Sequence, residues 1–142
     1  MQNLISRGIY KTKISAIRCV KELDAGDVYM KQELDLLGGA EEIFVRASRI
    51  IFEEMIPWII ENKSVPKPQQ GEPVEFKRRK PHEGNISSLK TLDEVFDYIR
   101  MLDAEGYPPA FLETENLRLE FSRPKRSLDS VFADVKISKK AE

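Results

Sequence analysis

The chain has 142 residues and a formal net charge of -1, with 41% hydrophobic and 33% charged residues. This composition is typical of a globular protein of one average domain or two small ones. A nearly neutral chain is not an electrostatic nucleic-acid binder as a whole, although local basic clusters remain candidate anion sites.

The composition also excludes several kinds of site. The one cysteine, Cys19, cannot form an intramolecular disulfide or a CxxC metal site, so we predict no metal and expect Cys19 to be a small core residue. No apolar run approaches the roughly 18 residues of a membrane span, and no signal-peptide core is present, which favours a cytoplasmic protein.

The first third of the chain predicts a strand–turn–strand unit. Residues 1–10 resemble the end of a helix, and residues 12–20 and 28–34 alternate as two strands. Between them lies the turn Asp24-Ala25-Gly26, in which we expect the glycine to supply a positive φ. Such a turn is more often structural than catalytic, but it can also hold a carboxylate rigidly beside an active site.

A long amphipathic helix is predicted next, from Ala40 to about Asn62, with Pro57 causing a kink. Residues 63–73 contain three prolines and a glycine, which indicates a stiff linker between two parts of the chain. The apolar stripe of the helix is predicted to be core; it comprises Ile43, Phe44, Ala47, Ile51, Met55, Trp58 and Ile59.

The second part predicts a helix and short antiparallel strands. After a short strand at 74–76, a capping box at Thr91 begins a helix with an apolar stripe at Leu92, Val95, Phe96, Ile99 and Leu102. A hairpin at 110–121 and a strand at 131–137 follow, and the tail from Ser138 is expected to fray. With about 65 residues, this part should lean on the first.

The basic run Lys77-Arg78-Arg79-Lys80 is the second candidate site. It is either a solvated strand end or a site for phosphate or RNA backbone, because arginine forks bind such anions in a bidentate manner. In an extended segment Lys77 and Arg79 would share one face and Arg78 and Lys80 the other. The only histidine, His82, follows in a loop flanked by proline and glycine.

Three motifs in order resemble the formyltransferase family, which includes methionyl-tRNA formyltransferase and amino-sugar N-formyltransferases. They are Leu23-Asp24-Ala25-Gly26-Asp27-Val28-Tyr29, then Phe76-Lys77-Arg78-Arg79-Lys80-Pro81, then Tyr107-Pro108-Pro109-Ala110-Phe111 after the Ile99-Arg100 helix. The resemblance covers residues 2–137. It implies an α/β protein: residues 1–62 as the C-terminal portion of a Rossmann-like formyltransferase domain, 63–73 as linker, and 74–142 as a small α+β module.

The resemblance also implies a reaction, the transfer of a formyl group from 10-formyltetrahydrofolate to a primary amine. The catalytic set of the family is an Asn, a His two residues later and an Asp in an Asp-x-Gly turn, and Asp24 matches that Asp. The Asn and His belong upstream of Gln2, together with much of the folate pocket, and His82 does not match the catalytic His. The sequence therefore resembles the C-terminal half of a formyltransferase.

Two functions follow from the resemblance and the residues. The chain is either a formyltransferase portion that is inactive alone, or a non-catalytic module that complements a separate N-terminal half, self-associates or binds an anion through Lys77, Arg78, Arg79 and Lys80. The amine could belong to an amino sugar or to methionyl-tRNA. Acidic residues interleave with the basic ones, and the Phe-x-Arg-Arg-x-Pro segment resembles the amino-sugar members, so a small amine is favoured.

Overall fold

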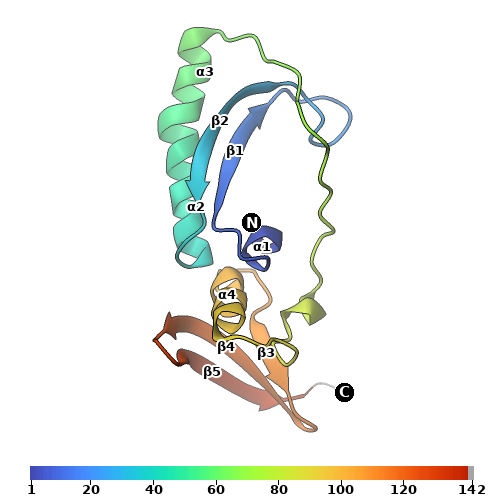
Figure 1. The fold of residues 1–142 in the computed structure, drawn as a ribbon, viewed down its shortest axis with the longest axis vertical. Helices are drawn as coiled ribbons and strands as arrows, with labels where there is room; N and C mark the ends of the chain where they lie inside the picture. Colours follow the sequence, from blue (N-terminus) through green and yellow to red (C-terminus); the bar gives the residue numbers. More distant parts are fainter. Residues whose placement is uncertain (141–142) are drawn as a thin grey trace.

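The computed structural model describes residues 1–140. It combines helices with two antiparallel sheets, as the predicted mixed fold requires (Figure 1). The first part comprises α1 (Gln2–Ile5), β1 (Lys11–Ile17), β2 (Val28–Asp35), α2 (Ala40–Arg49), η1 (Ile50–Met55) and α3 (Ile56–Asn62). The second comprises η2 (Pro81–Gly84), α4 (Leu92–Leu102), β3 (Ala110–Glu113), β4 (Leu117–Arg126) and β5 (Val131–Lys139). No described helix is long and apolar enough to cross a membrane.

The first part is a two-stranded ribbon beside one long, irregular helix (Figure 1). β1 and β2 pair antiparallel from Lys11 opposite Asp35, which confirms the predicted pairing. The helix irregularity predicted at Pro57 takes the form of the π-helical segment η1, which ends two residues before the proline. Proline lacks a backbone donor and clashes with the preceding turn, and a wider turn accommodates both defects.

The long helix is less buried than its apolar stripe predicts. Ile43 and Met55 are buried, but 41% of Phe44 and 39% of Trp58 are exposed. The core prediction is wrong for these two aromatic residues, because within the described residues β2 and α4 cover only part of the helix surface. Cys19 is also exposed, contrary to prediction, because β1 ends at Ile17 and the cysteine lies in the loop.

The second part is α4 packed on the sheet β3-β4-β5. The predicted hairpin pairs Ala110 with Phe121, and the capping box at Thr91 forms as predicted. In the predicted stripe of α4, Ile99 and Leu102 are buried, but 38% of Leu92 is exposed because it occupies the first turn of the helix.

Two further predictions about this part are wrong. Residues 74–76 form no strand, since no neighbouring strand pairs with them. The tail does not fray at Ser138, because β5 pairs with β4 as far as Lys139. The remainder of the predicted tail, residues 141–142, lies outside the described residues.

The two parts share one apolar cluster and one buried polar network. The cluster joins Ile5 and Leu36 of the first part to Ile99 and Met101 of α4. The network centres on Arg100, whose side chain is 3% exposed. This contact supports the expectation that the second part leans on the first, whereas the boundaries proposed for the two domains stay predictions.

The network consists of short hydrogen bonds. Arg100 donates to Asp97 at 2.7 Å and to the carbonyl oxygens of Leu36 and Gly38 at 2.7 Å each. The Tyr10 hydroxyl donates to the other oxygen of Asp97 at 2.7 Å. Two side chains of α4 thus hold the first part: Arg100 binds the β2–α2 turn, and Asp97 binds Tyr10 just before β1.

Candidate functional site

The turn that carries Asp24 differs from its prediction in one backbone angle. The left-handed conformation falls on Asp24, with φ of 55°, and not on Gly26. Aspartate tolerates this region better than most residues, because its short side chain can bond the local backbone. Gly26 is needed for another reason: a Cβ there would overlap the carbonyl oxygen of Arg18.

The segment predicted as a linker holds this turn in place. The Gln69 side-chain amide donates to the carbonyl oxygens of Asp24 at 2.6 Å and Gly26 at 2.8 Å. Two residues earlier, Lys67 exchanges backbone hydrogen bonds of 2.7 and 2.9 Å with Val28. Sequence reasoning missed Gln69, because nothing in a proline-rich segment shows which distant backbone it will reach.

The backbone of the turn is therefore fixed, whereas the Asp24 side chain is exposed. No hydrogen bond or ion pair of its carboxylate is found within residues 1–140. Asp27 is half-buried and lies 3.9 Å from the Arg18 guanidinium, so the two acids of the turn have different surroundings. Asp24 is the more exposed of the two.

The basic run lies at the far end of the same segment. Arg79 is half-buried; it donates to the Glu83 carbonyl oxygen at 2.7 Å, and its guanidinium lies 5.0 Å from the centre of the Tyr98 ring. Arg78 and Lys80 are exposed. The Lys77 carbonyl oxygen accepts a hydrogen bond from Asn3 at 3.1 Å, which ties the run to α1.

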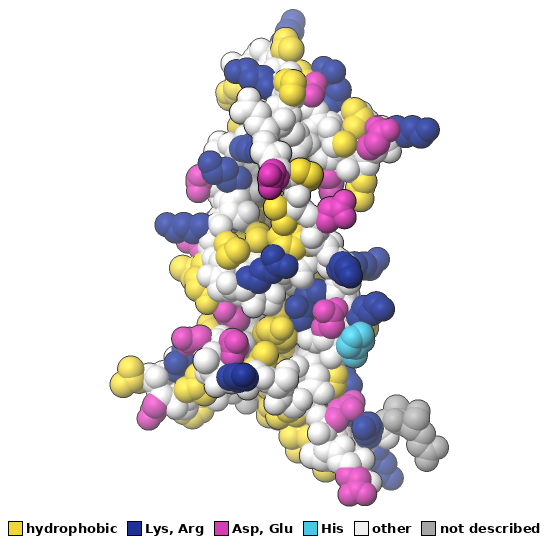
Figure 2. Space-filling view, turned by 45° about the vertical axis from the view of Figure 1, so that its right-hand side comes forward, with side chains coloured by type: hydrophobic (Ala, Val, Ile, Leu, Met, Phe, Trp, Pro, Cys, Tyr) yellow, Lys and Arg dark blue, Asp and Glu magenta, His cyan; other side chains and the backbone are white. Residues whose placement is uncertain are grey.

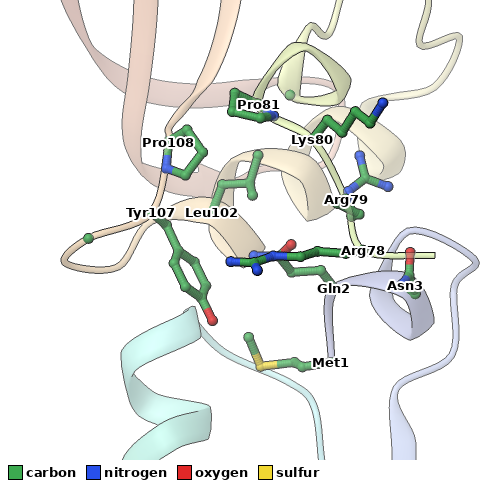
Figure 3. A pocket seen from close by; sticks show the side chains of 12 residues that line it. Met1, Gln2, Asn3, Arg78, Arg79, Lys80, Pro81, Leu102, Tyr107 and Pro108 are labelled. Carbon is green, nitrogen blue, oxygen red and sulfur yellow. The ribbon is translucent and has the colours of Figure 1, made fainter. Parts of the chain in front are cut away.

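A cavity of about 430 Å³ brings three of the four predicted cations together (Figure 3). Arg78, Arg79 and Lys80 line it, and Lys77 does not. The opposite wall consists of Leu102, Tyr107 and Pro108, from the end of α4 and the loop before β3. The alternation of faces expected for an extended strand does not hold, because the chain turns into η2 at Pro81.

The Asp24 turn contacts the segment 63–80 at Gln69, whereas the last three residues of the segment line the cavity. Gln69 contacts the turn, and Arg78 follows nine residues later. An extended chain of that length spans at most about 30 Å. His82, in η2, lies at the cavity end, so the structure does not bring it to Asp24. Within residues 1–140, no group of three or more metal-binding side chains occurs.

Comparisons with known proteins agree with the motifs. Residues 81–138 match the family model described as the C-terminal domain of methionyl-tRNA formyltransferase. The structure of methionyl-tRNA formyltransferase from Clostridium thermocellum superposes with a TM-score of 0.94 at 52% identity, covering 98% of this chain and 61% of that one. The chain thus matches the C-terminal part of a formyltransferase-family protein.

Other relatives of this chain are more distant. The curated methionyl-tRNA formyltransferase from Sulfurihydrogenibium sp. is 28% identical over 118 residues, which is 78% of this chain and 37% of the relative. HypX from Aquifex aeolicus, in complex with tetrahydrofolic acid, has a TM-score of 0.66 at 16% identity over 87% of this chain and 22% of its own. That likeness shows the fold alone. The chain thus spans less than two thirds of the relatives that it matches.

Proposed function

We propose that this chain contributes to formyl transfer from 10-formyltetrahydrofolate to a primary amine, with Asp24 as its catalytic carboxylate. The observation that carries the proposal is the match to the Clostridium thermocellum enzyme over 98% of the chain, at 52% identity. The Asp24 turn lies within the matched region, is held by Gln69 and leaves its carboxylate exposed. This is the arrangement that a residue acting on an incoming group needs.

The chemistry explains why a carboxylate is useful there. An amine that attacks a formyl carbon must lose a proton, and the tetrahedral intermediate carries an oxyanion that needs stabilisation. In the family a His handles the proton and an Asn stabilises the oxyanion, so Asp24 would orient the His and tune its charge. The 142 residues contain no Asn-x-His motif.

The chain alone should therefore show no measurable turnover. Residues that act as one catalytic unit are strongly non-additive, and a unit that lacks two members keeps little of its rate advantage. The donor is proposed from the resemblance to the family. We assign no residue of this chain to donor binding.

The amine substrate is either methionyl-tRNA or an amino sugar. Both of the more similar relatives are methionyl-tRNA formyltransferases, which favours methionyl-tRNA. The surface favours a small amine, because acidic and basic side chains are interspersed on the face in Figure 2 and form no continuous basic track. An assay must therefore offer both substrates.

The test is a folate-dependent formylation assay on the purified chain, alone and mixed with the N-terminal segment of the Clostridium thermocellum relative. We expect no product from the chain alone and product from the mixture. Asp24→Asn should reduce the rate of the mixture by at least about a hundredfold, as expected for loss of a group in acid–base chemistry. Glu22→Gln, an exposed acid of the same loop, is the matched control and should leave the rate unchanged.

Two results would count against this proposal. Robust product from the chain alone would show that the missing Asn and His are not needed. An active mixture that tolerates Asp24→Asn would remove the catalytic role of Asp24.

A second function, a non-catalytic module that complements a separate N-terminal half, is favoured by one observation. The long helix has exposed apolar surface that the described residues leave only partly covered, although Phe44 packs against Tyr107. Such a surface is normally buried against another layer of structure. Its members include Phe44 (41% exposed), Val45 (55%), Phe52 (68%), Trp58 (39%) and Ile60 (69%).

A further inference from the structure

The cavity beside the basic run has an excess of positive charge. Arg78, Arg79 and Lys80 line it, and no carboxylate does. Glu83, the nearest acid in the sequence, is turned away, because its carboxylate accepts a hydrogen bond from the Lys80 backbone. That bond and the neighbouring cations hold the pKa of Glu83 below its ordinary value. The Glu83 carboxylate is thus engaged with its own turn and does not line the cavity.

Arg78 is the cation that is available to a ligand. Figure 3 shows its side chain extending across the cavity toward Tyr107. Within residues 1–140 its guanidinium makes no ion pair or hydrogen bond, whereas Arg79 is held by Glu83 and Tyr98. A guanidinium with free donors binds phosphate oxygens in a bidentate manner. Arg79 and the flexible Lys80 add charge at the rim.

The wall of the cavity opposite the basic run can pack against a planar ring of a ligand. Tyr107 presents an aromatic ring to the cavity, with Leu102 and Pro108 beside it (Figure 3). Phe44 of α2 packs edge-on against Tyr107, at 5.9 Å between ring centres and an interplanar angle of 79°. This contact fixes the ring without covering both of its faces. Planar bases stack on such a ring with little dependence on their identity.

We propose that this cavity binds a small phosphate monoester of nucleotide size, with the phosphate on Arg78 and the ring against Tyr107. The volume of about 430 Å³ lies within the range of small-ligand sites, about 300–1,000 Å³. The site goes beyond formyl transfer: Arg78, Arg79 and Lys80 line it and no residue of the Asp24 turn does, since that turn contacts the segment nine residues earlier, at Gln69.

The surroundings argue against a nucleic acid as the ligand. Nucleic-acid binders neutralise many phosphates along a continuous basic surface. Here Glu72 and Glu75 precede the basic run, and Asp103 and Glu105 lie just before the Tyr107 wall. A ligand with a single phosphate group meets the cations without meeting these acids.

The test is a titration of the full chain with uridine monophosphate, and with uridine as the matched probe that lacks the phosphate, followed by backbone amide NMR. We expect saturable shifts at residues 78–80 and 106–107 with the monophosphate, and none there with uridine. Arg78→Gln should weaken the binding by at least about tenfold, because a charged hydrogen-bonded contact is lost. Arg49→Gln, an exposed arginine on α2, is the matched control and should bind as the wild type does.

Three results would overturn the proposal. The first is the absence of saturable shifts at these residues with the monophosphate, and the second is equal binding of uridine. The third is a short single-stranded RNA that binds residues 78–80 and is not displaced by the monophosphate, which would mark a nucleic-acid surface. All three readouts are independent of formylation, so failure of this site and failure of the proposed function are distinguishable.

Discussion

At the scale of single residues, the buried pair Asp97 and Arg100 decides how the two parts meet. Burying charges is costly unless they are paired and fully hydrogen-bonded. Here both carboxylate oxygens are used, by Arg100 and by Tyr10, and the guanidinium also binds two backbone carbonyls. Removing one member leaves the others unpaired, so the network acts as a unit.

The hydroxyl of Tyr10 makes the unfolding free energy depend on pH in the alkaline range. The hydrogen bond to Asp97, followed by burial, raises the pKa of Tyr10 above its ordinary value of 10.0. The stability from this bond is fully present below that ordinary value and is lost as pH rises through the folded-state pKa. Tyr10→Phe should therefore lose about 1 kcal/mol of unfolding free energy at pH 7, but should show a smaller decline than the wild type above pH 10.

Urea unfolding at pH 7 to 11 measures this difference. Tyr29→Phe, which changes a half-buried tyrosine of β2, is the control and should follow the wild-type pH dependence. If Tyr10→Phe declines above pH 10 as steeply as the wild type, the bond does not carry the effect.

At the scale of elements, the start of α4 follows from local chemistry. The Thr91 hydroxyl accepts from the Glu94 backbone at 3.2 Å, and the Glu94 carboxylate accepts from the Thr91 backbone at 2.9 Å. Four residues spaced in this way satisfy two donors of the first turn that would otherwise be unpaired. This part of the fold was predictable because every partner lies within the same turn.

Thr91→Ala removes the cap and should lower the unfolding free energy by about 1 kcal/mol. Thr91→Ser keeps the hydroxyl and should lower the unfolding free energy by no more than a few tenths of a kcal/mol. Chemical denaturation monitored by circular dichroism measures both. Equal losses for the two variants would show that the methyl group, and not the cap, is responsible.

The segment 63–80 makes contacts that its local sequence does not predict. Its prolines predict an extended, stiff chain, and the structure has one. The segment also holds the Asp24 turn, because Gln69 and Lys67 form hydrogen bonds with backbone atoms more than 35 residues away in the sequence. Such contacts depend on the path of the whole chain.

At the scale of the whole molecule, the partly covered apolar surface of the long helix predicts association. Exposed apolar surface of this kind is unfavourable in water and favours burial against a second molecule. In sedimentation velocity experiments we expect the chain to form concentration-dependent oligomers. Phe52→Glu should shift it toward the monomer, since it places a charge on that surface.

Leu128→Glu is the matched control, because Leu128 is 95% exposed on the turn between β4 and β5. It should leave the oligomers unchanged. A stable monomer at all concentrations would argue against association through the apolar surface of the long helix.

Sequence patterns were enough to predict most of the elements and the family. Alternation indicated the two hairpins, the 3.6-residue period indicated both long helices, and the three ordered motifs indicated a formyltransferase. These features depend on residues that are neighbours in the chain or on short sequence motifs. Only the tertiary structure shows which side chains are buried and that Asp24 has a positive φ. It also shows the hydrogen bonds from Gln69 to the turn and the cavity that Arg78 lines. Each requires segments far apart in the sequence to meet, and the pattern of one segment carries no information about what will cover it.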